Sequence, residues 1–326
     1  MSRARGYGWF LALAFTACCD ANEHSASRTT EIIGTSIEAV VRVHTSDDMA
    51  QASGSGFFFR ARNGEIYIIT NHHVVWGAST ITIERNDGIT DTATMFAADP
   101  ATDLALLRPA SRDAPRTLAF GDDRVLQRGD WVCALGSPSG VFNAASVGIL
   151  SARERLRGAA VAGERLVDHL FVDAVTSAGS SGGPIMDRHG KVIGVSAAVL
   201  GTSRGLGVAV PSSLASAVIT QLVANGHATH ASFGMQVADA PAGVDREPGL
   251  RVTEIVARGA ADMAQIRVGD NLLTVDGQSV PGPRELRMRA FESAAGTSWR
   301  LELLRDRERI TRVLQLHDLS DGTTDR

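Results

Sequence analysis

Lysine and aromatic residues are scarce in this chain of 326 residues. Lys191 is the only lysine, and Phe, Trp and Tyr together make up 5% of the sequence. The 32 basic residues face 36 acidic ones, which gives a formal charge of −4, and the arginines form no stripe. A protein that binds a phosphate backbone needs concentrated positive charge, so a nucleic-acid partner is not expected.

Cysteine is also scarce, with three residues in the whole chain. Only Cys133 lies inside the globular part, where an internal disulfide would need the extreme N-terminus, so we predict a buried, unreactive thiol in a strand. No cluster of Cys and His has the spacing of metal ligands. The sequence therefore predicts neither a metal site nor a cofactor.

The apolar run near the N-terminus is short. Trp9–Ala17 follows Arg3 and Arg5 and ends in small residues. Because this run is too short to span a membrane as a mature helix, it predicts a cleaved export signal over residues 1–17. The mature protein is therefore expected in the periplasm or elsewhere in the cell envelope.

Two interpretations of the end of this signal remain open. Phe15-Thr16-Ala17-Cys18 resembles a bacterial lipoprotein cleavage box, with Phe where Leu is usual. Cleavage there would make Cys18 the lipidated first mature residue, with the polar residues 18–34 as a tether to a lipid anchor in the membrane. An ordinary signal peptide that ends near cysteines is the alternative.

Residues 35–225 consist of short apolar runs separated by Gly, Asp-Gly and Asn-Gly turns. This pattern suits an antiparallel sandwich or barrel. Strands are predicted at Glu38–Val43, Gly56–Arg60, Ile66–Thr70, Ser79–Ile83, Asp103–Leu107 and Lys191–Ala197. From Ser212, a candidate N-cap, to Gly226 the apolar residues instead recur at helical spacing, which predicts an amphipathic helix that closes the first domain.

A change of pattern after this helix predicts a second domain. Residues 226–232 are interpreted as a linker, residues 233–318 as a small α/β domain and residues 319–326 as a tail. The predicted elements are strands at Gly249–Ile255, Asn271–Val275 and Trp299–Leu304, and short helices near Ala260–Gln265 and Arg284–Ser293.

Three stretches carry residues suited to nucleophilic catalysis, in the order His, Asp, Ser. They are Ile69–Val75, Ala98–Leu107 and Ala178–Pro184. Each alone has an ordinary explanation: a capping His at a strand end, an Asp that begins a strand, and a flexible Gly-Ser turn. Together, in a β-rich domain, they predict a Ser-His-Asp triad.

The chemistry of acyl transfer explains these residue types. A serine hydroxyl is a weak nucleophile near pH 7 and needs an adjacent base. Histidine, with an unperturbed pKa of about 6.5, can take up and return a proton there, and a buried carboxylate fixes its tautomer. Glycines beside the serine let the backbone turn sharply, so that N–H groups can point at the developing oxyanion.

The chain resembles the HtrA/Deg family of serine proteases along nearly its whole mature length. The motifs that carry the resemblance are Gly54-Ser55-Gly56-Phe57, Thr70–Val74, Asp99–Leu107, Trp131–Pro138, Gly148–Ser151, Gly179–Pro184 and Gly205–Ser212. This resemblance implies a mainly β protein, with a chymotrypsin-like double β-barrel over residues 35–225 followed by a PDZ domain. It also implies a homotrimer.

Matching the family motifs residue by residue assigns the triad. His73, three residues after Thr70, is the base, and His72 is a variable neighbour. Asp103 is the orienting acid, whereas Asp99 is interpreted as a turn residue. Ser181, directly before Gly-Gly-Pro, is the nucleophile. The oxyanion hole is formed by Gly179, Ser180 and Ser181, with backbone N–H groups of the first and third and the second shaping the loop.

The substrate pocket departs from that of trypsin-like enzymes specific for Lys or Arg. The position six residues before the nucleophile is Val175 rather than an acid. By resemblance the S1 pocket is lined by Thr176, Ser196, Val199 and Leu200. A small apolar pocket favours Val or Ala at P1, with modest selectivity of about 1–3 kcal/mol per methylene.

The second domain resembles a PDZ domain through Phe233-Gly234-Met235 and Val268-Gly269-Asp270. In that family an apolar-Gly-apolar loop binds a peptide carboxylate and the peptide adds a strand. By resemblance the loop is Phe233, Gly234 and Met235, and Leu286 faces the groove. A small domain without binding function is the alternative.

The sequence leaves more than one function open. The leading hypothesis is an endopeptidase that cleaves misfolded or regulatory proteins and binds polypeptide substrates and peptide C-termini. A peptide-binding, chaperone-like protein with secondary proteolysis is the alternative, and an esterase on the same fold is a third.

Overall fold

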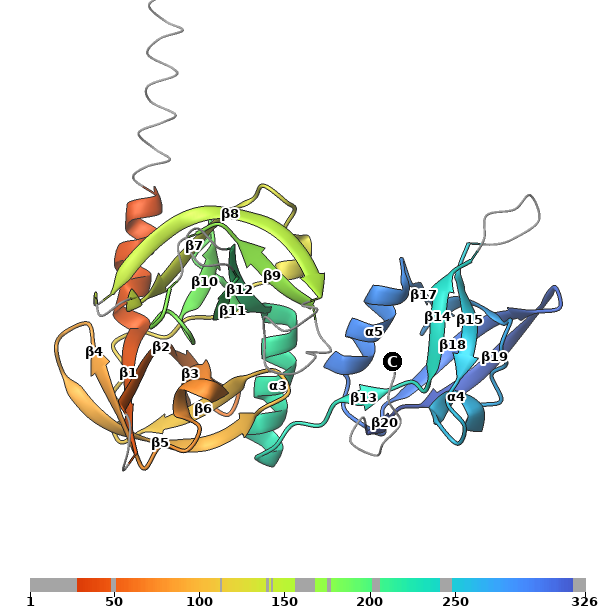
Figure 1. Ribbon diagram of the computed structural model, residues 1–326, viewed down its shortest axis with the longest axis horizontal. Coiled ribbons are helices and arrows are strands. Elements are labelled where there is room, and N and C mark those ends of the chain that lie inside the picture. Colours follow the sequence, from red (N-terminus) through yellow and green to blue (C-terminus); the bar gives the residue numbers. More distant parts are fainter. Residues whose placement is uncertain are drawn as a thin grey trace, which may run out of the picture. The chain divides into compact units, whose positions relative to one another are not determined.

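The computed structural model describes residues 28–47, 51–111, 113–138, 141, 143–155, 168–174, 177–200, 206–240 and 248–318, without the side chains of residues 155, 168 and 198–200. The predicted signal, Cys18 and the tail 319–326 lie outside these residues. The described part confirms the predicted fold class, a mainly β chain with two closed barrels and a further small domain (Figure 1).

The first barrel is a closed ring of six strands in the order β1-β2-β3-β6-β5-β4. Its strands alternate buried and half-exposed side chains, as in β1, because successive residues point to opposite faces. The bounds are β1 Val40–Ser46, β2 Gln51–Arg60, β3 Ile66–Asn71, β4 Thr80–Arg85, β5 Thr90–Asp99 and β6 Leu104–Pro109. A short helical turn, α2 (His72–Val75), follows β3.

The second barrel closes six strands in the order β10-β11-β12-β9-β8-β7. The bounds are β7 Trp131–Gly136, β8 Ala144–Arg155, β9 Asp168–Val172, β10 Pro184–Asp187, β11 Val192–Leu200 and β12 Leu206–Pro211. Cys133 lies in β7 and is fully buried, as predicted. Burial raises the pKa of its thiol to about 12, so the thiol is unreactive near neutral pH.

One helix precedes the barrel strands in the sequence, and another follows them. The predicted closing helix is confirmed as α3 (Ser212–Asn225), with Leu214 and Leu222 fully buried. Residues 28–36 are also helical, where an irregular tether was expected. Thr35 Oγ1 donates a hydrogen bond to the carbonyl of Glu31 at 2.9 Å. The polar composition of this segment, on which the tether was predicted, does not reveal such a local bond.

The chain divides into two compact units. Unit one comprises Met1–Phe96, Ala105–Arg153 and Leu170–Ser212, and unit two comprises Ala97–Leu104, Glu154–His169 and Ser213–Arg326. Most of both barrels belongs to unit one. The turn between β5 and β6 belongs to unit two.

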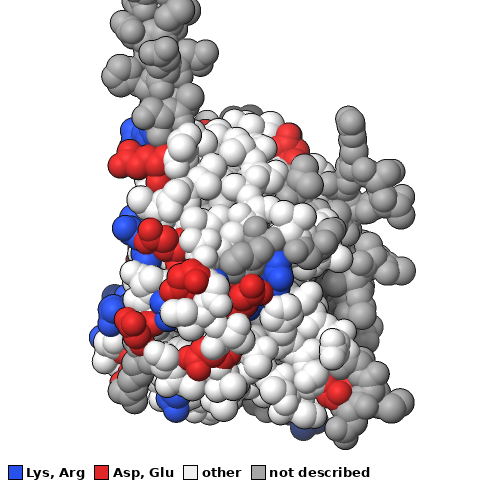
Figure 2. Space-filling view, turned by 90° about the vertical axis from the view of Figure 1, so that its left-hand side faces the viewer, with Lys and Arg blue, Asp and Glu red and all other residues white. Residues whose placement is uncertain are grey.

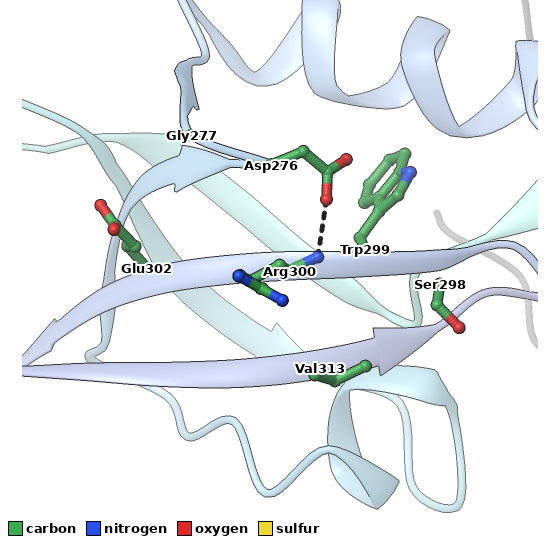
Figure 3. A pocket seen from close by; sticks show the side chains of 7 residues that line it. All are labelled: Asp276, Gly277, Ser298, Trp299, Arg300, Glu302 and Val313. Carbon is green, nitrogen blue, oxygen red and sulfur yellow. Dashed lines mark hydrogen bonds between the residues drawn. The ribbon is translucent and has the colours of Figure 1, made fainter.

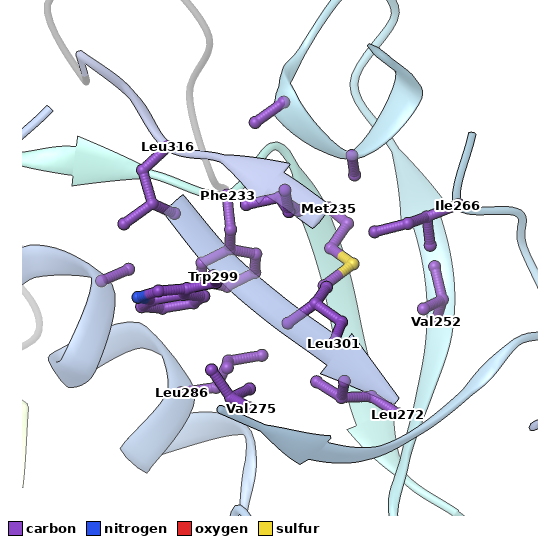
Figure 4. Packing of buried hydrophobic residues seen from close by; sticks show 14 of the residues in the cluster. Phe233, Met235, Val252, Ile266, Leu272, Val275, Leu286, Trp299, Leu301 and Leu316 are labelled. Carbon is purple, nitrogen blue, oxygen red and sulfur yellow. The ribbon is translucent and has the colours of Figure 1, made fainter. Parts of the chain in front are cut away.

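Unit two contains a sheet in the order β14-β15-β16-β18-β19, with β17 paired to β16. The elements are β13 Ala231–Ser232, β14 Met235–Asp239, β15 Leu250–Ile255, α4 Ala260–Met263, β16 Asn271–Val275, β17 Gln278–Ser279, α5 Pro283–Glu292, β18 Ser298–Arg305, β19 Glu308–Gln315 and β20 His317–Asp318. Its core packs Phe233, Leu286 and Trp299 with the apolar faces of the strands (Figure 4).

The strand β19 was not predicted, because its arginines, Arg309 and Arg312, fall on opposite faces and its burial alternates only weakly. It pairs with β18 along the full length of both strands. Tertiary pairing therefore decided this element.

Charges of both signs are interspersed on the face shown in Figure 2. Within the first barrel Arg42 lies 3.3 Å from Glu84, and Arg85 lies 2.9 Å from Asp87. Among the described residues no helix combines the length and the hydropathy needed to cross a membrane.

Candidate functional site

His73 lies in the single helical turn α2, directly after β3. Asn71 keeps an extended backbone, and the next residue begins the turn. The turn is held from below, because Val74 and Val75 are buried and Thr45 Oγ1 donates to the Val74 carbonyl at 3.1 Å. His73 itself is exposed, which suits a base that must reach a substrate.

Ser181 lies in the tight loop that directly precedes β10 (Pro184–Asp187). Ser180 N donates to the Ser177 carbonyl at 2.9 Å, and Gly183 N donates to the Ser180 carbonyl at 3.0 Å. Gly182 N reaches the carbonyl of Ser196 at 2.7 Å. These bonds fix the loop against β11.

The backbone of the same loop suits an oxyanion hole. Gly179 has a φ of 96°, a left-handed conformation that favours glycine. Within the described part of the chain, the N–H groups of Gly179 and Ser181 donate to no backbone carbonyl. Two such N–H groups can stabilise the oxyanion of a tetrahedral intermediate. The Ser181 hydroxyl donates a long hydrogen bond, 3.5 Å, to the Ala197 carbonyl.

The loops of His73 and Ser181 converge on β2. Ser55 N donates to the Ser181 carbonyl at 2.8 Å. A Cβ on Gly54 would lie 2.7 Å from the side chain of Val74, the neighbour of His73, and 3.1 Å from the Ser181 carbonyl. Tertiary structure thus brings together two motifs that are more than a hundred residues apart in sequence.

Asp103 directly precedes β6, which neighbours β3 in the first barrel. It is buried, with 3% of its surface exposed. Its φ of 61° is unusual for a residue other than glycine, and its N–H donates to the Pro100 carbonyl at 3.3 Å. His73 follows β3 and Asp103 precedes β6, so the two residues flank neighbouring strands of the barrel.

The side chain of Asp99 is engaged within unit two. Its Oδ2 accepts a hydrogen bond from Thr102 Oγ1 and lies 2.8 Å from His230 Nε2. Burial raises its pKa, but the hydrogen bond and charge of His230, together with the Thr102 bond, outweigh this effect and leave its pKa below the ordinary value of 3.8. The prediction of a turn residue was wrong by one position, because Asp99 is the last residue of β5 and the turn begins at Pro100.

The predicted S1 residues are described only in part. Ser196 lies in β11 and is 3% exposed, and its N–H donates to the Gly183 carbonyl at 2.9 Å. A cavity of about 20 Å³ touches Ser180 and Ser196 and is otherwise lined by Ala134, Leu135, Gly136, Pro138, Ala144, Ala145 and Ser146. Val175 and Thr176 and the side chains of Val199 and Leu200 lie outside the described residues.

The predicted peptide loop of unit two precedes β14. Phe233 and Met235 are 1% exposed and Leu286 is fully buried, so all three belong to the core (Figure 4). Gly234 has a φ of 68°. Among the described strands β14 pairs only with β15, and α5 contacts β14. An edge strand beside a helix can accept an added peptide strand.

Sequence reasoning missed a hollow of about 510 Å³ in unit two (Figure 3). It is lined by Asp276, Gly277, Ser298, Trp299, Arg300, Glu302 and Val313, and contains none of the predicted peptide-loop residues. Asp276 Oδ1 accepts a bond from Arg300 N at 2.8 Å. The only signal in the sequence was the Val275-Asp276-Gly277 turn.

Comparisons with known proteins agree with both parts of this architecture. The family described as trypsin-like peptidase domain matches residues 54–195, and the PDZ domain family matches residues 221–304. A probable periplasmic serine endoprotease, DegP-like, from Brucella suis is 37% identical over 267 residues, or 76% of this chain and 50% of that protein. The chain combines a trypsin-like peptidase domain with one PDZ domain and is similar to proteins named as DegP-like and HtrA-type serine proteases.

Two further relatives of this chain agree. The serine protease Do-like HtrA of Bacillus subtilis is 28% identical over 299 residues, or 86% of this chain and 67% of that protein. The solved structure of the HtrA-type protease AlgW with tripeptide matches with a TM-score of 0.72 and 27% identity, and covers 88% of this chain and 96% of that chain. The chain spans about half the length of the DegP-like relatives.

In the described residues of this chain no group of three or more His, Cys, Asp or Glu side chains converges.

Proposed function

We propose that this chain is an HtrA-type serine endopeptidase of the cell envelope. Ser181 is the nucleophile, His73 the general base and Asp103 the acid that orients His73. In the acylation step the Ser181 oxygen bonds to the scissile carbonyl carbon while His73 takes its proton. His73 then gives that proton to the leaving amine, and water hydrolyses the acyl-enzyme by the reverse proton movements.

One observation carries the proposal: the Ser181 loop is bonded to β2 beside the turn that carries His73. The bond from Ser55 N to the Ser181 carbonyl and the close packing at Gly54 support it. The burial of Asp103 and its place before β6 support the acid assignment. The names of the relatives support proteolysis rather than ester hydrolysis.

The experiment is Ser181→Ala in the mature protein. Removing one member of a triad is expected to lower turnover of a casein substrate on the order of 10⁶-fold. A fluorophosphonate, which phosphonylates the Oγ of an activated serine with loss of fluoride, should label the wild type at Ser181 only. Ser180→Ala is the matched control and should still be labelled. Equal labelling of wild type and Ser181→Ala would contradict the assignment.

The same variant separates this proposal from the chaperone-like alternative. If Ser181→Ala protected client proteins in cells as well as the wild type does, peptide binding would be the main function. Loss of protection together with loss of turnover supports the endopeptidase.

We further propose that unit two binds the C-termini of polypeptides along β14. The carboxylate would lie at the loop Phe233–Met235, and the peptide would extend between β14 and α5; the predicted contact of Leu286 with the peptide would require this side chain, which is fully buried, to become accessible. The unpaired edge of β14 supports this mode, as does the peptide present in the solved structure of AlgW. Calorimetry with a hydrophobic C-terminal peptide and its amidated form tests it, since only the free carboxylate should bind.

We also propose export to the periplasm, a lipid anchor at Cys18 and assembly as a homotrimer. The relatives named periplasmic support the compartment, and the cleavage box supports the anchor. Palmitate labelling that is lost in Cys18→Ala would support lipidation, and analytical ultracentrifugation would distinguish a trimer from a monomer.

A further inference from the structure

Ser55 is a fully buried serine in the middle of β2. It belongs to the motif Gly54-Ser55-Gly56-Phe57, which contributes no residue to the proposed triad or to the proposed oxyanion hole. A buried hydroxyl must find hydrogen-bond partners, because an unsatisfied polar group in the interior costs free energy. The partners of Ser55 therefore indicate why a serine stands there.

Every polar atom of Ser55 is bonded to a part of the active site or to its support. Its N–H donates to the Ser181 carbonyl at 2.8 Å, and its Oγ donates to the Gly179 carbonyl at 2.6 Å. The same Oγ accepts a bond from Ser137 N at 2.9 Å. The Ser55 carbonyl accepts a bond from Thr70 Oγ1 at 2.7 Å, three residues before His73.

The surroundings leave little room around this hydroxyl. A Cβ on Gly136 would lie 3.0 Å from Ser55 Oγ and 3.3 Å from Ser180 Cα. A Cβ on Gly182 would lie 2.2 Å from the Ser55 carbonyl oxygen. Glycines on both sides thus allow the nucleophile loop to approach β2 closely enough for these bonds.

Gly179 is the residue that most needs such a restraint. Its left-handed φ of 96° is one of several conformations open to glycine, so its own backbone preference does not fix the loop. The Ser55 Oγ holds its carbonyl, and the Ser55 N–H holds the carbonyl of Ser181. The bond to the Gly179 carbonyl fixes the 179–180 peptide, which directly follows the Gly179 N–H, and the bond to the Ser181 carbonyl fixes the 181–182 peptide. The peptide that carries the Ser181 N–H lies between these two fixed planes, so both bonds restrict how it can turn.

We propose that Ser55 is a positioning residue for the reaction, whose hydroxyl fixes Gly179 so that the N–H groups of Gly179 and Ser181 face the oxyanion. This inference rests on the proposed endopeptidase function. Through Thr70 the same residue also links the nucleophile loop to the strand that leads to His73. Ser55 touches neither substrate nor reacting atoms.

The experiment compares Ser55→Ala with the wild type in steady-state hydrolysis of a peptide. A misplaced oxyanion hole weakens binding of the transition state more than that of the substrate, so kcat should fall about 10- to 100-fold with KM within about twofold. The affinity for a peptide boronate, which forms a tetrahedral adduct at Ser181, should fall by the same factor as kcat/KM. Ser55→Thr, which keeps the hydroxyl, should recover most of the lost kcat.

Ser212→Ala is the matched control, since Ser212 is also fully buried in unit one. Its Oγ likewise donates to a backbone carbonyl, that of Gly121 at 2.9 Å, and accepts from a backbone N–H, that of Asp123 at 3.1 Å. This variant should lower the melting temperature like Ser55→Ala but leave kcat unchanged. Equal kcat losses in the two variants would overturn the proposal, because they would reflect general destabilisation.

Two further outcomes are distinguishable. If Ser55→Ala melted below the assay temperature, Ser55→Cys would replace it, because a thiol fills similar space and donates a weaker hydrogen bond; wild-type kcat in that variant would overturn the proposal. If the wild type itself were not labelled by a fluorophosphonate, the endopeptidase function would fail. Labelling of wild type and Ser55→Ala at equal rates would refute only the role of Ser55.

Discussion

At the scale of single residues, the Ser181 loop depends on a glycine, because a side chain at Gly182 would collide with its neighbours. Gly182 has a φ of 86° and lies against the backbone of β2 and the hydroxyl of Thr70. Its neighbour Ser181 can therefore approach the strand that supports the His73 turn. The absence of a side chain at Gly182 sets how closely the Ser181 loop approaches β2.

Gly182→Ala should disable the loop. The new Cβ would lie 2.2 Å from the Ser55 carbonyl oxygen and 2.4 Å from Thr70 Oγ1, so the loop must shift. Displacement of catalytic groups by about 1 Å can cost about 10²-fold in rate, and we expect at least that loss in kcat/KM. Fluorophosphonate labelling of Ser181 measures the effect.

Gly190→Ala is the control for backbone strain alone. Gly190 has a φ of 71°, yet its nearest neighbour to an added Cβ is Ile32 at 3.5 Å. A left-handed alanine costs about 1–2 kcal/mol of stability, and the labelling rate should stay that of the wild type. Equal labelling rates for folded Gly182→Ala and the wild type would contradict the steric argument.

At the scale of elements, a buried ion pair joins a short helical turn to strand β8 of the second barrel. Asp123, in the helical turn η2 (Asp123–Val125), is fully buried and forms an ion pair with Arg153 of β8. Ser212, the first residue of α3, lies 3.0 Å from the same carboxylate through its Oγ. Three elements far apart in sequence therefore share one buried charge.

Arg153→Ala should destabilise unit one by about 3–5 kcal/mol, because it leaves the Asp123 carboxylate buried without its partner. Urea denaturation measures the change. Arg124→Ala is the control, since Arg124 pairs with Asp122 at 2.9 Å on the surface, and its loss should cost less than about 1 kcal/mol. Similar losses in the free energy of unfolding in both variants would contradict the argument that the buried ion pair stabilises the protein more than the surface pair does.

At the scale of the whole molecule, unit two gathers three separate stretches of the chain. Asp99, the last residue of β5, contacts His230 near the start of β13. The His230 ring stacks on Phe291 of α5 with a centroid distance of 4.0 Å. The carboxylate of Asp99 is therefore a candidate for pH-dependent stability.

Asp99→Asn should lower the stability of unit two by about 1.5–3 kcal/mol at pH 7. Because the folded-state pKa of Asp99 lies below its unfolded value, its contribution is fully present above about pH 3.8. The contribution is lost as the pH falls through the folded-state pKa, so the two proteins should converge in acid. Urea denaturation at pH values from 7 down to 3 measures this.

Glu308→Gln is the control for this experiment. Glu308 is an exposed carboxylate of β19 in the same unit. Its replacement should change stability by less than about 0.5 kcal/mol at any pH in that range. A difference between Asp99→Asn and wild type that stayed constant with pH would contradict the argument.

Local pattern predicted much of this fold. Short apolar runs between turns predicted the positions of several barrel strands, and the helical spacing after Ser212 predicted α3. The helix over 28–36 and strand β19 escaped prediction, since a local side-chain bond at Thr35 and pairing with β18 stabilise them. These stabilising contacts are invisible in hydrophobic periodicity.

The sequence by itself determined the fold class, the family resemblance and the candidates His73, Asp103 and Ser181, because backbone period and motif spacing are local properties of the chain. Only the tertiary structure decided that the Ser181 loop docks on Ser55, that Asp99 contacts His230 and that Leu286 is buried. The physical reason is that hydrogen bonds and packing between distant segments depend on how the strands close into barrels.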